Sequence, residues 1–339
     1  MPMQDGGMEI IMEYLVVTDF IDNTNGRDVA DDLQQLIDKN PNRTLFFPDG
    51  DYYLSKPIVT SADPKLSVSL KLSNYARIAA ADNWNGDGAL VRLGGKDFAN
   101  DIRTVGSNYY FEGGIIDGSG VADGISIDGG RETAVRNVSI KHTRIGLYIK
   151  RGANGGSSDA DIFGVNIVGN RQQDSIGLLT EGWDNTFTNM RISDVFIGVW
   201  LKSSGNMLRN VHPLYTLDYE DFENSCGFIS DEGKPDNWFD FCYSDQFAIG
   251  FLIKDHVVLQ NCFCFWYSPR EKQHIAVKAV GEFKSIISNL VVGFCGNEAE
   301  NAVLKAEKGG RGIIQNLIIS SGAEIHDEMY KEYLTGTTI

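Results

Sequence analysis

The chain has 339 residues, and 42% of them are hydrophobic, which is enough to bury a large core in one domain or two. Its formal net charge of −16 argues against nucleic acid or anionic lipid as a partner, because such partners require a basic stripe on the protein. No run of 18 apolar residues is present, so we expect no membrane span.

The start of the chain and its cysteines bear on where the protein works. Residues 1–14 contain no basic region followed by an apolar stretch, so we expect a cytoplasmic protein, or a secreted one if a signal has been removed. The cysteine count is odd, and the Cys262–Cys264 spacing does not suit a metal knuckle. We therefore expect buried reduced thiols, no metal and no cofactor at Cys226, Cys242, Cys262, Cys264 and Cys295.

The N-terminal segment contains the clearest signal for a helix. Residues 14–20 are typical of a strand, and residues 43–54 of a strand, a turn and a second strand. Between them, residues 28–40 place Val29, Leu33, Leu36 and Ile37 on one face, with an aspartate at position 28 to cap the first turn.

Beyond this segment, one short pattern recurs six times: a glycine within an apolar strand. Successive copies are 21 to 31 residues apart, at Gly124, Gly146, Gly177, Gly198, Gly227 and Gly250. Units of this length, made of strands without helices, predict a solenoid of β coils. A solenoid needs a cap over its first coil, so we assign 1–60 to an integral N-terminal cap and 61–339 to the coils.

The order VTDF…ADDLQQLID…RTLFFPDGDYYLSKPI, within residues 17–58, resembles the N-terminal region of the pectate-lyase-like parallel β-helix superfamily. The coil pattern extends the resemblance to about residue 320. The resemblance implies an all-β, right-handed parallel β-helix with a short N-terminal α-helical cap. Members are mostly glycoside hydrolases, polysaccharide lyases and phage tailspikes.

Strand alternation predicts which residues face outward. The residues on either side of each repeat glycine are expected to fill the lumen, and the glycine to face outward. The outward face then carries an apolar stripe beside a column of alternating charges. We expect this stripe to form a subunit interface, or to lie under a loop or terminal segment. The resemblance implies a parallel homotrimer through the stripe, which consists of Tyr148, Leu179, Trp200, Ile229 and Leu252.

A second series places an asparagine before an apolar strand in each coil. Asparagine tolerates left-handed backbone geometry, and stacked amides can bond to each other along a solenoid. We therefore interpret the series as structural, at Asn137, Asn166, Asn189, Asn210, Asn261, Asn289 and Asn316.

The spacing between the two series predicts a binding face. The gap from asparagine to glycine is 9 to 11 residues in the coils of Asn137, Asn166 and Asn189. It is 17, 13 and 15 residues after Asn210, Asn237 and Asn261, with Ala276 in the glycine position of the last coil. Extra length at one turn of a solenoid usually serves binding. We expect extended loops that stack into one wall at 211–225, 238–248 and 262–274.

These loops are rich in aromatic and acidic residues, which suits a glycan. Aromatic rings stack on sugars, and glycosidic cleavage needs one protonated and one ionised carboxyl group. The candidate acids are Asp218, Glu220, Asp221, Asp240 and Asp245, with Asp221 and Asp245 the first choice. The candidate substrate-binding residues are His212, Tyr215, Trp238, Tyr243, Trp266, Tyr267 and Arg270.

The sequence therefore predicts a carbohydrate-active enzyme, favouring a glycoside hydrolase or a glycosyl-transferring relative that acts on a neutral glycan. The motif patterns of polygalacturonases and of typical pectate lyases are missing, so no catalytic residue is transferred from a family. The alternatives are a polysaccharide lyase, in which Arg270 and a lysine or histidine act on a uronate-containing glycan, and a non-catalytic glycan-binding or tailspike-like protein.

Overall fold

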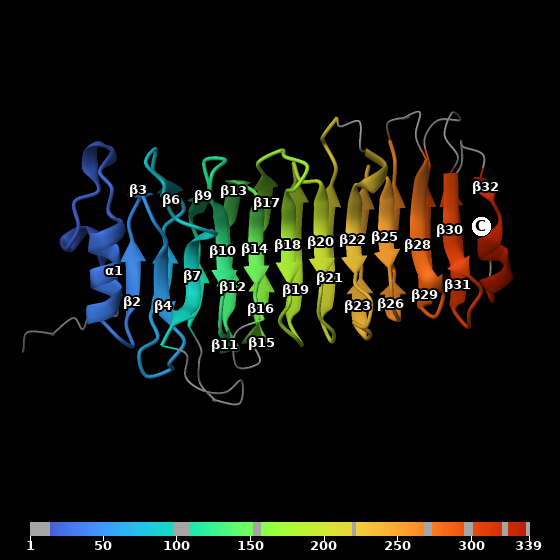
Figure 1. Ribbon diagram of the computed structural model, residues 1–339, viewed down its shortest axis with the longest axis horizontal. Helices are drawn as coiled ribbons and strands as arrows, with labels where there is room; N and C mark the ends of the chain where they lie inside the picture. The colour runs from blue at the N-terminus through green and yellow to red at the C-terminus, as the bar shows by residue number, and fades with distance from the viewer. Residues whose placement is uncertain are drawn as a thin grey trace, which may run out of the picture.

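The computed structural model describes residues 14–97, 109–151, 157–218, 222–267, 273–294, 301–320 and 325–336. In this part of the chain, strands pair in parallel with the equivalent strand of the next coil, as β14 with β18 and β19 with β21 do. The coils follow each other along a rod from the N-terminal to the C-terminal end (Figure 1). The fold is an all-β parallel β-helix, as the repeats predict.

Eleven described strands form the sheet that contains the repeat glycines, which we call the glycine sheet. Its strands are β4 (Ile58–Ser61), β7 (Ala89–Lys96), β10 (Asp123–Ile127), β14 (Ile145–Ile149), β18 (Ile176–Thr180), β20 (Ile197–Leu201), β22 (Cys226–Ser230), β25 (Ile249–Ile253), β28 (His274–Glu282), β30 (Asn301–Lys308) and β32 (Ile325–Asp327).

Nineteen described strands form the sheet that contains the asparagine series, which we call the asparagine sheet. Its strands are β1 (Tyr14–Val16), β2 (Thr44–Phe47), β3 (Gly50–Leu54), β5 (Ser69–Leu72), β6 (Ala76–Ala80), β8 (Tyr110–Glu112), β9 (Ile115–Asp117), β12 (Ala134–Arg136), β13 (Ser139–Thr143), β16 (Asp161–Phe163), β17 (Asn166–Gly169), β19 (Thr186–Ser193), β21 (Met207–Leu214), β23 (Asn237–Asp240), β24 (Tyr243–Asp245), β26 (Val257–Gln260), β27 (Phe263–Phe265), β29 (Ile286–Gly293) and β31 (Ile313–Ser320).

The remaining described elements are short. Two strands form a separate pair, β11 (Gly130–Arg131) and β15 (Ser157–Ser158). The helices are α1 (Ala30–Lys39) and the 3₁₀ turns η1 (Val17–Asp19), η2 (Thr24–Gly26), η3 (Phe222–Asn224) and η4 (Met329–Tyr333). None of the helices in the described part of the chain has the length and apolarity that crossing a bilayer requires.

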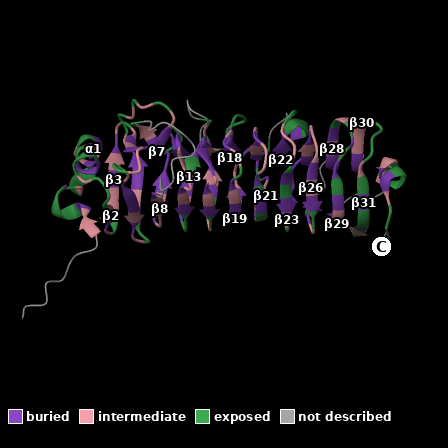
Figure 2. Ribbon diagram, turned by 90° about the horizontal axis from the view of Figure 1, so that it is seen from below, coloured by how far each residue is buried: buried purple, intermediate pink, exposed green. Residues whose placement is uncertain are grey.

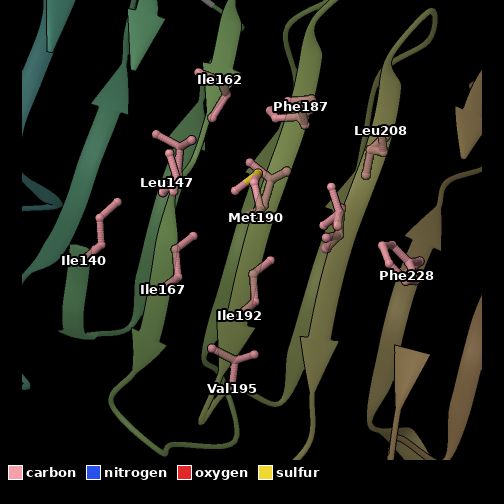
Figure 3. Close-up of a cluster of buried hydrophobic side chains, with 14 of the residues drawn as sticks. Ile140, Leu147, Ile162, Ile167, Phe187, Met190, Ile192, Val195, Leu208 and Phe228 are labelled. Atoms are coloured by element: carbon pink, nitrogen blue, oxygen red, sulfur yellow. The ribbon is translucent and has the colours of Figure 1, made fainter. Parts of the chain in front are cut away.

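Apolar side chains from both sheets fill the space inside the coils. Ile140, Ile167 and Ile192 lie in register on successive rungs β13, β17 and β19, and each is at most 1% exposed (Figure 3). The buried residues follow the strands along the whole rod, and exposed residues lie at turns, at the two ends and at several positions of strands such as β31 (Figure 2). Each coil thus buries its apolar residues against its neighbours, as expected of a solenoid.

Helix α1 lies at the N-terminal end of the rod (Figure 1). It buries Leu33, Leu36 and Ile37, and Asp28 accepts a hydrogen bond from the backbone nitrogen of Ala30 at 3.0 Å. On its partly buried side, Gln34 accepts a hydrogen bond from the nitrogen of Val59 at 2.8 Å and donates one to its oxygen at 2.9 Å. Val59 belongs to β4, the edge strand of the glycine sheet, so one side chain satisfies a backbone pair at this edge.

We expect Gln34→Ala to lower the free energy of unfolding by about 1–3 kcal/mol, because Val59 loses two hydrogen bonds in a partly buried position. Denaturant unfolding measures the change. Gln35→Ala is the matched control, since this neighbouring glutamine is exposed. Equal stability of the two variants would show that the two hydrogen bonds between Gln34 and Val59 do not contribute to the stability of the fold.

The repeat glycines point inward, which corrects the prediction that they face outward. A Cβ atom at Gly177 would lie 2.3 Å from Cγ2 of buried Ile192, and one at Gly146 would lie 2.5 Å from Cγ2 of buried Ile167. The residues before these glycines, Ile145 and Ile176, instead pack with Leu179 in a cluster separate from the main core. Simple alternation fails because each strand begins where the chain turns a corner.

The apolar stripe on the outer face of the glycine sheet is largely covered within the single chain. Leu179 is 5% and Ile229 6% exposed, and Lys202 lies over the Trp200 ring at 4.2 Å from its centroid. In the charged column beside the stripe, Lys150 pairs with Asp128 at 3.1 Å and Lys254 with Asp231 at 2.7 Å. The homotrimer stays a prediction.

The asparagine series lies at a left-handed corner of each coil, as predicted, for six of its seven members. Asn210 donates to Asn189 at 2.7 Å, and Asn289 donates to Asn261 at 2.9 Å. The six have φ between 53° and 57°: Asn137, Asn189, Asn210, Asn261, Asn289 and Asn316. The exception is Asn166, which lies in β17, while Gly164 takes the corner of that coil with φ 67°.

Asn237 belongs to a different ladder, inside the fold. Asn185 donates to Asn206, and Asn206 donates to Asn237, each at 3.0 Å between side-chain amides, and all three residues are fully buried. The left-handed corner of that coil is Phe241, with φ 53°. This assignment changes the loop lengths on which the predicted binding wall depends.

Candidate functional site

The stretch 238–248 is not an extended loop, which corrects one of the three predicted loops. Nine residues separate the corner residue Phe241 from Gly250, as nine separate Asn189 from Gly198. Residues 237–245 form the regular strands β23 and β24, and only 246–248 connect them to the glycine sheet. The connections at 215–225 and 266–273 are longer, and each is described in part.

The three predicted stretches nevertheless meet, because their coils are adjacent. The Tyr215 ring lies 5.3 Å from that of Phe247, and Nε1 of Trp266 donates to the oxygen of Phe247 at 2.6 Å. Tyr215 and Trp266 are each only 1% exposed, so their predicted role in substrate binding is wrong. Their rings, together with Phe222, close the core behind the loops and cannot stack on a sugar.

The described residues form a groove elsewhere, on the outer face of the asparagine sheet. Its volume is about 620 Å³, and it crosses the coils of β19, β21, β24 and β27. Parallel pairing aligns residues two positions past each left-handed corner, so Arg191, His212, Tyr243 and Phe263 form one column. The full lining is Thr188, Asn189, Arg191, Arg209, Asn210, His212, Phe241, Tyr243 and Phe263.

Within this column, a histidine and a tyrosine from adjacent coils stack face to face. The rings of His212 and Tyr243 are 4.2 Å apart with an angle of 10° between their planes. Asp245, with a side chain 10% exposed, places Oδ2 3.6 Å from Nε2 of His212. This distance is too long for a hydrogen bond, but catalytic hydrogen bonds are often long without substrate and shorten when it binds.

Asp245 also acts on the neighbouring tyrosine. Burial, the negative charge of Asp245 and a hydrogen bond to its carboxylate raise the pKa of Tyr243 to about 12. Its hydroxyl therefore keeps its proton at neutral pH and can give it to a bound substrate. Since Nε2 of His212 is buried against Asp245, Nδ1 is the ring nitrogen available to the groove.

Two arginines line this groove, and two carboxylates lie close to its lining residues. Arg209 pairs with Asp240 at 3.5 Å and is 63% exposed. Arg191 donates to the backbone oxygens of Met190 and Asn210, and no carboxylate lies within ion-pair distance of it among the residues described. Arg191 can therefore bind an anionic group of a ligand, although the protein has a net charge of −16.

The other predicted site residues that the structure describes do not line this groove. Asp240 faces outward on the same coil as Asp245 and accepts a hydrogen bond from Asn261 at 3.2 Å. Asp218 is exposed beyond the end of β21, and Tyr267 is 54% exposed beyond the end of β27. Trp238, 40% exposed, lies in the other half of the asparagine sheet, in register with Met207 and outside the groove lining. Glu220, Asp221 and Arg270 lie outside the described residues.

Sequence reasoning missed Arg191, Arg209, Phe241 and Phe263. The signal that could have found them is their offset from the left-handed corners. Arg191, His212 and Phe263 each follow a corner asparagine by two residues, and Tyr243 follows Phe241 in the same way. Because Phe241 replaces the expected asparagine, this alignment was not visible.

The described part of the chain contains no candidate metal site and no reactive thiol. No group of three or more histidine, cysteine, aspartate or glutamate side chains there is placed to hold a metal ion. Cys226, Cys242, Cys262 and Cys264 are buried and unpaired, and Cys295 lies outside the described residues. Burial raises the pKa of Cys226 to about 12, which leaves its thiol unreactive.

Several solved structures share this fold. The endo-xylogalacturonan hydrolase of Aspergillus tubingensis is 12% identical with a TM-score of 0.56, over 88% of this chain and 98% of that one. The A-module of the mannuronan C-5 epimerase AlgE6 of Azotobacter vinelandii is 12% identical with a TM-score of 0.56, over 96% of this chain and 98% of that one.

A double mutant of the tailspike protein of E. coli bacteriophage HK620 is 11% identical with a TM-score of 0.66, over 96% of this chain and 65% of that one. No protein-family model and no curated protein matches the sequence. At these identities the similarity shows the fold alone, and it confirms the predicted parallel β-helix.

Proposed function

We propose that the protein is a carbohydrate-active enzyme that binds a uronate-containing glycan in the groove of β19, β21, β24 and β27 and cleaves it by β-elimination. The observation that carries this proposal is the stacked His212–Tyr243 pair beside two exposed arginines. This is the polysaccharide lyase that the sequence offered as an alternative, with Arg191 and Arg209 in place of Arg270.

The arrangement supplies the three functions that β-elimination requires. Arg191 and Arg209 bind the uronate carboxylate and make the hydrogen on C5 more acidic. His212 takes that proton through Nδ1, and the electrons of the C5–H bond form the C4–C5 double bond. The C4–O bond breaks with its electron pair on the leaving oxygen, which receives the proton of the Tyr243 hydroxyl. His212 then loses its proton to solvent and Tyr243 takes one from solvent, which restores both residues.

The similar structures support a glycan as ligand. They are a hydrolase of xylogalacturonan and an epimerase of mannuronan, and a mutant of the same tailspike forms a complex with a pentasaccharide. Galacturonan and mannuronan are polymers of uronates, which agrees with Arg191 and Arg209 in the groove.

One observation favours hydrolysis of a neutral glycan as the second candidate. Asp245 is a nearly buried carboxyl group beside an aromatic ring, and Asp240 is a more exposed one on the same coil. Such contrasting environments suit an acid and a base. In this alternative, Asp218, Glu220 and Asp221 of the adjacent loop are further candidates for the second carboxyl group.

The test is product analysis after incubating the protein with a panel of polyuronates and neutral oligosaccharides. We expect polyuronates to give products with the ultraviolet absorbance of an unsaturated uronate. Saturated products from any glycan would favour the hydrolase, and binding without products would favour a non-catalytic glycan-binding protein. If no glycan binds, the assignment to carbohydrate chemistry fails.

A further inference from the structure

A second groove lies along the asparagine sheet, and the coil of β19 contributes to both grooves. Its volume is about 480 Å³, and it crosses the coils of β9, β13, β17 and β19. The two grooves meet at β19, where Arg191 lines the first and Asp194, directly after the strand, lines the second. The described lining is Asp117, Ser119, Gly120, His142, Val168, Gly169, Asn170, Arg171 and Asp194.

The second groove contains a well-ordered histidine–aspartate pair. Nδ1 of His142 lies 2.9 Å from Oδ1 of Asp117, which also accepts a hydrogen bond from the nitrogen of Ser119 at 3.0 Å. Nη1 of Arg77 donates to the other carboxylate oxygen at 3.1 Å. The side chain of Asp117 is 11% exposed and that of His142 is 57% exposed, so the imidazole is fixed on one side and open to a ligand on the other.

Charged groups surround the His142–Asp117 pair. Burial disfavours the charged form of Asp117, but the hydrogen bonds from His142, Ser119 and Arg77 lower its pKa below the ordinary value. Arg171 pairs with Asp194 at 2.8 Å across the groove and is 60% exposed. Cations with carboxylates beside them are the groups that bind the carboxylate and the hydroxyls of an acidic sugar.

Strand register gives the separation between Asp117 in the second groove and Asp245 beside the first. Asp117 is in register with Lys141, Val168, Ser193, Leu214 and Asp245 on successive rungs. Five rung spacings separate Asp117 from Asp245, which is about 24 Å along the rod. The intervening strands β13, β17, β19 and β21 are parallel, and the coil of β19 contributes lining residues to both grooves.

We propose that the second groove is a distal subsite for the same glycan, with His142 and Arg171 as its binding residues. The substrate class is then a linear polyuronate long enough to reach from Tyr243 to His142, rather than a short oligosaccharide. This inference rests on the proposed function only for the identity of the ligand.

The test compares the binding of two sodium oligogalacturonates, one too short to span the grooves and one long enough, to the full chain by calorimetry. We expect the wild type to prefer the long oligomer, and Arg171→Gln and His142→Gln each to reduce that preference about tenfold. Arg136→Gln is the matched control, because Arg136 forms a similar pair with Asp161 on the adjacent coil outside both grooves. Thermal unfolding identifies any variant that fails to fold. Arg171→Gln keeps the contacts of the buried Asp117 with His142 and Arg77.

The outcomes separate this inference from the proposed function. A preference for the long oligomer that depends on Arg171, without unsaturated products, supports the subsite and overturns the elimination chemistry. Unsaturated products with equal affinity for both oligomers overturn the subsite and leave the chemistry. If Arg136→Gln reduces the preference as much as Arg171→Gln, general loss of positive charge explains the result and the subsite is rejected.

Discussion

Tyr243→Phe is expected to lower kcat on a polyuronate about 100-fold or more, with little change in glycan affinity. The substitution removes the proton donor for the leaving oxygen but keeps the ring that stacks on His212 at 4.2 Å. General acid–base catalysis typically contributes about 10²- to 10⁴-fold to a rate. Initial rates from the absorbance of unsaturated product, together with calorimetric affinity, measure the two effects separately.

Tyr75→Phe is the matched control for this experiment. Tyr75 is 77% exposed and lies in the turn before β6, outside both grooves, so its hydroxyl should not matter. A Tyr243→Phe variant that keeps wild-type kcat would remove tyrosine from the mechanism. If Asp245→Asn then abolished the formation of saturated products, the hydrolase alternative would explain the site better.

Gly177→Ala is expected to destabilise the fold by about 1–3 kcal/mol. The added Cβ would lie 2.3 Å from Cγ2 of Ile192 and 2.7 Å from the oxygen of Gly198, one a buried side chain and the other the next rung. Forcing extra volume into a well-packed core typically costs this much. Denaturant unfolding, with the slope checked for two-state behaviour, gives the change in free energy.

Two further variants identify the cause of that loss. Gly309→Ala makes the same substitution where the nearest atom, the Tyr333 hydroxyl, is 3.7 Å away, and we expect a change within about 0.5 kcal/mol. Combining Gly177→Ala with Ile192→Ala relieves the clash, so the double variant should lose less stability than the two single losses added together. Strict additivity would show that the glycine is not required by its contact with Ile192.

The sequence predicted the features that repeat in every coil. The solenoid, the helix over 28–40 and the left-handed corners follow from local preferences and spacing, and the structure contains them at α1 and at positions such as Asn189 and Asn210. Repetition makes such features visible, because the same local requirement is met in each rung. The adjacency of the three aromatic stretches also followed from the coil order.

The candidate site was predicted less well because it depends on exact register and on burial. The corner of the coil of β23 and β24 is Phe241, four residues after Asn237. Because the prediction placed the corner at Asn237, it counted four strand residues as part of an extended loop. Aromatic residues in a loop can face a ligand or the core, and for Tyr215 and Trp266 the neighbouring coils fill every side of the ring. His212, Tyr243 and Asp245 were among the predicted residues and do lie together.

By itself, the sequence determined that this chain forms stacked β coils, since the period of its glycines and asparagines depends only on residues within one coil. Only the tertiary structure decided that Arg191, His212 and Tyr243 share a groove and that a second groove continues it past Asp194. The physical reason is that a groove on a solenoid is built across rungs. Successive residues of its column lie 20 to 31 positions apart in sequence, and their alignment depends on the hydrogen-bonded register between strands.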